Sequence, residues 1–321
     1  MAVYTELSHD EIRHFLGAYD LPPLQEAEGI CAGVENTNYL LTLQGGGRFI
    51  LTLFEKRVAE ADLPFFVGLM EELAAKRVPA PMPLRAKDGQ AIRTLKGRPA
   101  VMVTFLEGKS AVTIKPVHIS ELGAAMARLH MGALEYKHIR CNSLSLPAWR
   151  VLLEKISPHM DEIAAGLAEE LQAEMAALES LWPKTLPEGV IHADLFPDNV
   201  FYDAEGQLTG IIDFYFSCND FLSYDLAICL NCWCFEKDFQ FNITRAKGLL
   251  RAYNDQRLLS EEELNALPVL ARGAALRFLL TRAHDWLFPV PGALVTPKDP
   301  MEYLKKLRFH RSVKHHREYG L

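Results

Sequence analysis

Three oxygen-bearing side chains in one stretch of the chain have the types and the spacing that phosphoryl transfer requires. Asp194 follows an apolar run, Asn199 comes five residues later, and Asp213 ends the next apolar run. Phosphoryl transfer needs a carboxylate that accepts a hydroxyl proton, and hard oxygen ligands that hold Mg²⁺ against a polyphosphate. These residues therefore predict a base at Asp194 and metal ligands at Asn199 and Asp213.

The elements that must position these side chains are short β-strands. Residues 190–191, 200–201 and 210–212 are apolar runs, and each borders one of the polar positions. Pro197 lacks a backbone N–H group and excludes a helix between the first two runs. We therefore expect a polar loop between two strands, with Asp213 at the end of a third.

The spacing His192-x-Asp194-x-x-x-x-Asn199 matches the catalytic loop of protein kinases, in which the Asp accepts the substrate proton and the Asn binds metal. Asp, Asn and Pro are also ordinary turn residues, so a loop without catalytic function is the alternative. The flanking apolar runs, and the segment I-I-D-F at 211–214, favour the catalytic interpretation.

Residues 192–201, which read H-A-D-L-F-P-D-N-V-F, and residues 210–214, which read G-I-I-D-F, resemble the aminoglycoside phosphotransferase and choline kinase family. The resemblance runs from about residue 29 to about residue 286 and is strongest over 190–230. Within this family of small-molecule kinases, the segments are most similar to bacterial enzymes that phosphorylate L-homoserine. The resemblance implies ATP and Mg²⁺ as cofactors, and direct transfer to the side-chain hydroxyl of L-homoserine, a step of threonine biosynthesis.

The same resemblance implies an α+β, protein-kinase-like fold with two lobes. A chain of 321 residues is long enough to form two lobes that share one cleft. The expected small N-terminal lobe, residues 1–105, has an antiparallel sheet and binds the nucleotide. The expected larger lobe, residues 106–321, is mainly helical and carries the catalytic and substrate-binding residues.

The N-terminal third is expected to form a helix followed by strands. Ser8 and Glu11 have the spacing of a capping box, and residues 39–43 and 49–54 are strand-like runs around the glycines at 45–47. The polar turn at 33–38 can bring backbone N–H groups close to a nucleotide. By resemblance, Gly33, Asn36, Thr37 and Asn38 would contact the ATP phosphates, and the hinge residues Thr104, Phe105 and Leu106 would contact adenine.

One position departs from the family pattern. Thr52 stands where the family has a strand lysine that binds the phosphates, and an apolar residue is expected at the position of the glutamate that pairs with that lysine. Glu71 and Glu72 lie one turn later on the helix expected over 63–77, and Lys56 and Arg57 are the nearest cations. This departure keeps a nucleotide-binding pseudokinase as an alternative to an active kinase.

The acceptor site is expected in the final third, where helices are predicted over 239–253, 261–270 and 271–288. Arg272, Arg277 and Arg282 cluster there, and the rigid guanidinium fork suits bidentate binding of a carboxylate. An ion-paired surface face is the alternative. Because the substrate-binding part of the family lies in these helices, we expect Arg277 or Arg282 to bind the substrate carboxylate, with Tyr215 beside the acceptor.

Two residues are expected to support the catalytic loop. Asp225 precedes an apolar run, where a carboxylate caps a helix N-terminus, and by resemblance it would brace the loop. His192 is expected to hold the loop by hydrogen bonding. His130, on an apolar helical face, is more typical of a buried and hydrogen-bonded histidine than of a ligand.

The composition and the charge of the chain indicate which kinds of molecule it is expected to bind. A net charge of −7 without a Lys/Arg run argues against nucleic acid or an anionic membrane and favours a small molecule. The first residues do not resemble a signal peptide and no long uncharged apolar run occurs, so a cytoplasmic protein is expected. Cys229, Cys232 and Cys234 have half of a zinc-site spacing, but without a second pair they favour a buried helix.

The sequence is also compatible with acceptors other than L-homoserine. Choline, ethanolamine, hydroxylysine and aminoglycosides are the alternatives within small-molecule kinases. A choline pocket needs aromatic faces around the quaternary cation, and Trp233, Tyr215 and Trp286 could supply them, so choline stays an alternative. An aminoglycoside pocket needs many acidic groups. The arginine cluster disfavours both.

Overall fold

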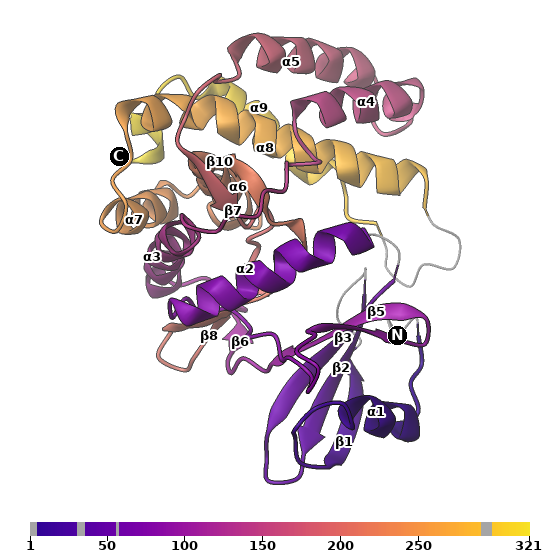
Figure 1. Cartoon of the computed structure of the whole chain (residues 1–321). Coiled ribbons are helices and arrows are strands. Elements are labelled where there is room, and N and C mark those ends of the chain that lie inside the picture. Colours follow the sequence, from indigo (N-terminus) through magenta and orange to yellow (C-terminus); the bar gives the residue numbers. More distant parts are fainter. Residues whose placement is uncertain (1–4, 31–35, 56–57, 290–296) are drawn as a thin grey trace.

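The computed structural model describes residues 5–30, 36–55, 58–289 and 297–321. The chain forms a lobe built on a β-sheet and a larger lobe of helices (Figure 1). The sheet is antiparallel and five-stranded, in the order β1-β2-β3-β5-β4. Its strands are β1 (Leu24–Ile30), β2 (Asn36–Leu43), β3 (Arg48–Phe54), β4 (Ile92–Leu95) and β5 (Arg98–Thr104).

The β2–β3 hairpin turns at the predicted glycine run. Gly45 and Gly46 have φ angles of 89° and 91°, in the left-handed region that glycine adopts without strain. The predicted hairpin is confirmed, and it places Asn38 opposite Thr52 in the register.

Alternating side chains of the sheet supply two hydrophobic cores, because successive residues of a strand point to opposite faces. In β5, Ala100 and Met102 pack in the core that includes α1 (His9–Leu16), whereas Val101 and Val103 pack in the core that includes α2 (Leu63–Ala75). The capping box predicted at Ser8 and Glu11 begins α1. Each face of the sheet is thus covered by one helix.

The second lobe consists of helices around two small sheets. The helices are α3 (Pro116–Gly132), α4 (Leu146–Ile156), α5 (Leu167–Leu181), α6 (Leu222–Trp233), α7 (Ile243–Asn254), α8 (Glu261–Leu287) and α9 (Met301–Ser312). The small sheets pair β7 (Glu188–Ile191) with β10 (Cys218–Phe221), and β8 (Val200–Tyr202) with both β6 (Lys109–Ser110) and β9 (Leu208–Ile211). The predicted α+β architecture with two lobes is the architecture observed.

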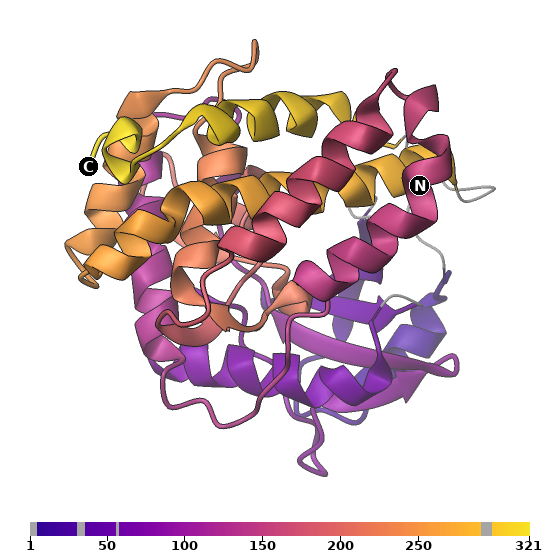
Figure 2. The same cartoon turned by 90° about the horizontal axis from the view of Figure 1, so that it is seen from above.

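Helix α8 is the central element of the helical lobe. It packs against α4, α5, α6 and α9 and crosses the whole lobe (Figure 2). The prediction of two helices, over 261–270 and 271–288, was wrong, because one uninterrupted helix runs from Glu261 to Leu287 and includes Pro268. Within the described residues α8 is also long and apolar enough to span a membrane, but 67% of its most apolar window is buried inside the lobe, as expected of a core helix.

Candidate active site

The loop between β7 and β8 is held through its backbone N–H groups by one carboxylate. Asp225, in the first turn of α6, accepts hydrogen bonds from the N–H of His192 and the N–H of Ala193, each at 2.8 Å. Its Oδ2 also lies 3.1 Å from Nε2 of the buried His130. The predicted helix cap is therefore wrong, whereas the bracing of the loop that the family resemblance implies agrees with these bonds.

The environment of Asp225 keeps it ionised. Burial alone would raise the pKa of its carboxyl group, but the hydrogen bond from His130 and the backbone N–H donors of the loop outweigh burial, and the pKa lies below its usual value. A buried carboxylate that accepts several hydrogen bonds is a rigid support, because breaking any of them leaves a buried polar group unpaired.

Side chains of α6, of α8 and of the loop itself bond the carbonyl groups of the same loop. Arg277 of α8 donates from Nη1 to the carbonyl of Ala193 at 2.7 Å. Trp233 of α6 donates from Nε1 to the carbonyl of Leu195 at 2.8 Å. Asn199 donates from Nδ2 to the carbonyl of Asp194, also at 2.8 Å. The N–H groups and the carbonyl groups of the loop are thus both bonded, so the backbone that carries Asp194 is fixed.

His192 joins this loop to the segment that carries Asp213. Its Nε2 donates to the carbonyl of Ile212 at 2.9 Å, and its Nδ1 accepts the N–H of Asp194 at 3.3 Å. Burial lowers the pKa of this histidine, which favours the neutral ring that such a pattern needs. The N–H of Ile212 in turn donates to the carbonyl of Asn199 at 3.0 Å, so the two segments are bonded twice.

The three oxygen-bearing side chains singled out in the sequence line one cavity. It has a volume of about 690 Å³, and Asp194, Asn199 and Asp213 are all on its wall. Because Nδ2 of Asn199 is bonded to the loop, its Oδ1 is the atom available to a cation. Across the described ranges no three His, Cys, Asp or Glu side chains form a metal cluster, so a cation would need Asn199, Asp213 and phosphate oxygens together.

The hinge after β5 forms another part of this wall. Thr104 uses its N–H and its hydroxyl in hydrogen bonds with Met82, both at 2.9 Å, and Phe105 donates its N–H to Arg48 at 3.3 Å. This leaves the N–H of Leu106 as the hinge amide available to a ligand. Apolar side chains of Ile50 and other residues line the rest of this end of the cavity.

The predicted phosphate turn is only partly on the cavity wall. Asn36 and Asn38 line the cavity, whereas Thr37 between them points to the opposite face of β2 and donates to Glu55 at 2.7 Å. The alternation of a strand explains this difference, and it removes the Thr37 side chain from the predicted nucleotide-binding set. Gly33 lies outside the described residues.

At the position where the family has its lysine, Thr52 faces the cavity and donates to Oδ1 of Asn38 at 2.7 Å. The residue of α2 on the cavity wall is Met70, as expected from an apolar residue near the usual glutamate. Glu71 and Glu72 pair instead with Arg85 and Lys76. Lys56 and Arg57 are outside the described residues, and in the described part the cations that line the cavity are Arg282 and Lys298.

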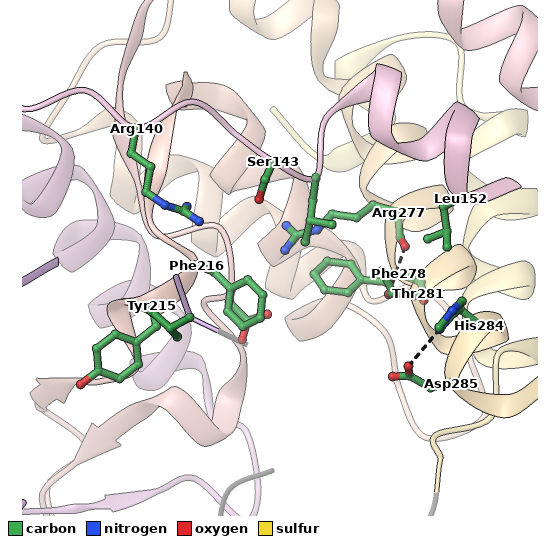
Figure 3. A pocket seen from close by; sticks show the side chains of 13 residues that line it. Arg140, Ser143, Leu152, Tyr215, Phe216, Arg277, Phe278, Thr281, His284 and Asp285 are labelled. Carbon is green, nitrogen blue, oxygen red and sulfur yellow. Dashed lines mark hydrogen bonds and ion pairs between the residues drawn. The ribbon is translucent and has the colours of Figure 1, made fainter. Parts of the chain in front are cut away.

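A second cavity of about 380 Å³ shares Asp194 with the first as a lining residue. Tyr215, Phe216 and Phe278 also line both cavities. The polar side chains of the smaller cavity come from α8 and from the segment between α3 and α4 (Figure 3): Arg140, Ser143, Arg277, Thr281, His284 and Asp285. Asp194 therefore lies where one bound molecule could meet another.

The three arginines of the predicted cluster have different surroundings. Arg277 is 2% exposed and lines the smaller cavity, and no carboxylate among the described residues pairs with it. Its Nε is buried without a hydrogen-bond partner there. Arg282 lines the larger cavity and bonds Glu302 at 2.6 Å, and Arg272 bonds Glu174 at 2.8 Å. Of the two predicted carboxylate-binding residues, only Arg277 lies in the smaller cavity.

Among the predicted aromatics, Tyr215 alone lies on the wall of these cavities. Its ring packs edge-on against Phe54 and Phe66, with centroids 4.9 and 5.7 Å away, and burial raises the pKa of its hydroxyl. Trp233 is fully buried behind the loop, and Trp286 is on neither wall. The aromatic box that choline requires is not assembled from these residues.

The cysteines of α6 belong to the support of the loop. The thiols of Cys229 and Cys232 lie 3.6 and 3.5 Å from the carbonyl of Leu195, the same carbonyl that Trp233 bonds. All cysteines in the described ranges are free, and burial raises the pKa of Cys229 and Cys234. This spacing therefore reflects a buried helix, as the sequence indicated.

Sequence reasoning missed Arg140 and Asp285. Arg140 is in an irregular segment where no periodicity marks a site, and Asp285 is one of many charged residues near the end of α8. The spacing of Arg277, Thr281 and Asp285, four residues apart on one helix, was the signal available, because such residues share a face.

A sheet-based lobe, a helical lobe, and an Asp-Asn-Asp set between them define a phosphotransferase with a protein-kinase-like fold. The sequence model described as "Phosphotransferase enzyme family" matches residues 26–261. The chain belongs to this family.

Full-length relatives are similar to this chain throughout. A protein named homoserine kinase from Paramagnetospirillum magneticum is 52% identical over 326 residues, covering 100% of both chains. A protein of the same name from Nitrobacter hamburgensis is 54% identical over 321 residues, covering 100% of this chain and 98% of the relative.

Solved structures share the fold at low sequence identity. An amicoumacin kinase in complex with AMP-PNP and Ca²⁺ has a TM-score of 0.69 at 15% identity, covering 96% of this chain and 95% of that one. A spectinomycin phosphotransferase in complex with ADP and spectinomycin has a TM-score of 0.68 at 13% identity, covering 98% of both.

Proposed function

We propose that the protein transfers the γ-phosphoryl group of ATP to the side-chain hydroxyl of L-homoserine. The observation that carries this proposal is the position of Asp194, which opens onto both cavities. A nucleotide in the larger cavity and an acceptor in the smaller one would meet at this carboxylate. The name shared by the full-length relatives supports L-homoserine as the acceptor.

In this proposal the larger cavity holds ATP with Mg²⁺. Adenine lies against the hinge, with the N–H of Leu106 as its donor, and Asn36 and Asn38 lie on the phosphate side. Asn199 and Asp213 hold the metal, which when bound neutralises charge on the phosphates. Residues 1–105 then act as the nucleotide-binding lobe and residues 106–321 as the catalytic and acceptor-binding lobe. The AMP-PNP and Ca²⁺ bound by the amicoumacin kinase support a nucleotide and a divalent cation.

Asp194 orients the acceptor hydroxyl and accepts its proton. The hydroxyl oxygen forms a bond to the γ-phosphorus while the bond from that phosphorus to the β,γ-bridging oxygen breaks, and ADP leaves. Transfer is direct, so no enzyme group carries the phosphoryl group. The fixed loop backbone supports this role, because a misplaced base lowers the rate steeply.

Arg277 binds the carboxylate of the acceptor. A buried guanidinium without a carboxylate partner is costly, and a carboxylate supplied by the substrate would remove that cost through charge-assisted hydrogen bonds. Its bond to the carbonyl of Ala193 places the cation one residue from the base. The net charge of −7 fits a small-molecule partner better than nucleic acid or an anionic membrane.

A screen of acceptors tests this function. The purified full-length protein is incubated with Mg-ATP and one of L-homoserine, hydroxylysine, choline, ethanolamine or an aminoglycoside, and ADP release is measured. We expect ADP release that depends on L-homoserine, with a phosphate monoester in the ³¹P NMR spectrum, and its loss with EDTA and recovery with Mg²⁺. Preference for another acceptor, or binding of Mg-ATP without turnover on any of them, would overturn the proposal.

A further inference from the structure

Thr52 gives the sheet side of the larger cavity no positive charge, although a polyphosphate bound there needs one. Within the described ranges the cations that line this cavity are Arg282 and Lys298, and both belong to the helical lobe. A nucleoside triphosphate keeps net negative charge even with Mg²⁺ bound, so such cations attract it. What these two side chains bind deepens the proposed function, on which their assignment rests.

Arg282 lies at the end of the larger cavity where the transferred phosphoryl group must be. It comes four residues after Phe278 on α8, and residues at this spacing share a face of a helix. Phe278 and Asp194 each line both cavities. The γ-phosphoryl group must lie at this end as well, because it has to reach an acceptor in the smaller cavity.

The guanidinium of Arg282 keeps donors for a ligand. Its Nη1 bonds Oε2 of Glu302 at 2.6 Å and the carbonyl of Asp299 at 3.3 Å, whereas its Nε and Nη2 make no hydrogen bond with the described residues. Glu302 also accepts Nζ of Lys306 at 2.5 Å, so one carboxylate is shared by two cations. The side chain of Arg282 is only 13% exposed, and charge-assisted hydrogen bonds are strong where water is mostly excluded.

Lys298 is placed beside the catalytic loop by an aromatic ring. Its Nζ lies 6.0 Å from the ring centroid of Phe196, and that ring packs edge-on against Phe278 with centroids 5.0 Å apart. The N–H of Phe196 donates to the carbonyl of Asp194 at 2.8 Å. In the described part of the chain no carboxylate pairs with Lys298, and its side chain is exposed. Its ammonium group can therefore approach an anion at this end of the cavity.

We propose that Arg282 and Lys298 bind the γ-phosphoryl oxygens of ATP, in place of the strand lysine that the family has where this chain has Thr52. Both cations would then stabilise the negative charge that spreads over these oxygens during transfer. ADP lacks the γ-phosphoryl group, so these contacts are made with the triphosphate alone. Arg282, which the sequence suggested for the carboxylate of the acceptor, thus serves the nucleotide.

Nucleotide affinities measured without turnover test this assignment. Isothermal titration calorimetry of the full-length protein gives the Kd of Mg-AMP-PNP and of Mg-ADP, which differ by the γ-phosphoryl group. Lys298→Met keeps an apolar side chain near Phe196 and removes the charge, so it should weaken binding of Mg-AMP-PNP about 10-fold and that of Mg-ADP less than about 2-fold. Lys298→Arg, which keeps the charge, should recover most of the affinity.

The same pattern is expected at Arg282. Arg282→Met should weaken Mg-AMP-PNP binding about 30-fold with little change for Mg-ADP, because Lys306 still pairs with Glu302. Each Met variant should also lower kcat roughly 10-fold or more, since the contacts strengthen as charge develops, and should leave the KM for L-homoserine unchanged.

Two substitutions away from both cavity walls are matched controls. Lys305→Met removes an ammonium group that lies 4.2 Å from the ring centroid of Phe239. Arg245→Met removes a guanidinium that bonds Glu236 and the carbonyl of Phe235, as Arg282 bonds a glutamate and a carbonyl. Both controls should leave the two Kd values unchanged.

Three outcomes would overturn the assignment. They are equal losses for Mg-AMP-PNP and Mg-ADP, unchanged affinity for Mg-AMP-PNP in both Met variants, and a raised KM for L-homoserine without a change in nucleotide affinity. A wild-type protein that binds neither Mg-AMP-PNP nor Mg-ADP would instead overturn the proposed function itself.

Discussion

The two walls of the larger cavity differ in how their polar groups are held. On the helical side, the loop that carries Asp194 is bonded by Asp225, Arg277 and Trp233, which come from the interior of the lobe. On the sheet side, the hydroxyl of Thr52 donates to Oδ1 of Asn38 on the neighbouring strand, and both residues line the cavity. The first wall therefore depends on buried bonds between elements distant in the sequence, and the second on one bond between two neighbouring strands at the cavity wall.

This difference indicates which wall of the cavity tolerates substitutions. A buried support cannot lose one member without leaving other polar groups unpaired, whereas a pair at a cavity surface can exchange its partner for water. The helical side thus fixes the position of Asp194, and the sheet side accommodates a threonine where the family has a lysine. Substitutions on the two walls should therefore differ in how much they change activity and stability.

The largest effect is expected at Asp194. Asp194→Asn removes the proton acceptor and should lower kcat by roughly 1,000-fold or more, with little change in the KM for ATP or in the melting temperature. Steady-state kinetics and thermal unfolding measure the two effects. Asp203→Asn, in the exposed β8–β9 turn, is the matched control. A kcat near that of the wild type would show that Asp194 is not the base.

A loss of stability is expected at Asp225. Asp225→Ala removes the acceptor of two loop N–H groups and of His130, so it should lower the free energy of unfolding by about 3–5 kcal/mol. Urea unfolding of this variant and of Asp225→Asn, which keeps one acceptor oxygen, would measure the difference. A change below about 1 kcal/mol would contradict the view that the helical wall is one bonded unit.

Acid should weaken the helical side in two stages. His192 and His310 are buried with lowered pKa values, that of His310 being about 3, so unfolding binds their protons and stability falls as the pH drops below the unfolded histidine value of about 6.5. Asp225, whose pKa is lowered, adds a second loss as the pH falls below about 4. Urea midpoints from pH 8 to pH 3 would reveal both stages, and constant midpoints would refute them.

A smaller effect is expected behind the loop. Trp233→Phe removes the indole donor to the carbonyl of Leu195 and should cost about 1 kcal/mol of stability, with a fall in kcat of a few-fold. The thiols of Cys229 and Cys232 remain near the same carbonyl and limit the loss. Chemical unfolding and initial rates on the same preparation check this expectation, which an unchanged stability would disprove.

The smallest effect is expected on the sheet side. Thr52→Ala should raise the KM for ATP by less than about 3-fold, because Oδ1 of Asn38 can replace the lost hydroxyl with water. ATP titrations at saturating acceptor measure this change. A rise of more than about 10-fold would place much of the phosphate binding on the sheet and would remove the contrast between the two walls.

Local patterns were sufficient for the features that local physics decides. The glycine run between two strand-like runs predicted the β2–β3 hairpin, and the flanking apolar runs predicted the strands around Asp194. The Asp-Asn-Asp spacing predicted three residues that the fold brings to one cavity wall. In each case the relevant residues are close in the sequence, so their types and spacing carry the information.

Tertiary structure decided the rest. Thr37 was misplaced because the start of β2, which fixes its direction, could not be read from a polar turn. Arg277 and Arg282 look equivalent in sequence, but Glu302 of α9 pairs with one and not with the other. Asp225 looked like a helix cap because its partners, His192 and His130, are distant along the chain.

The bond from Arg277 to Ala193 has a consequence for how acceptor preference can evolve. One guanidinium both fastens the backbone beside the base and, as proposed, receives the acceptor's negative group. A descendant that adopted a neutral or cationic acceptor would keep an uncompensated buried charge, or would lose the fastening if the arginine were replaced. Before such a substrate could be used, another side chain would have to bond the carbonyl of Ala193. A change of acceptor would therefore require a substitution in the support of the loop as well as one in the acceptor site.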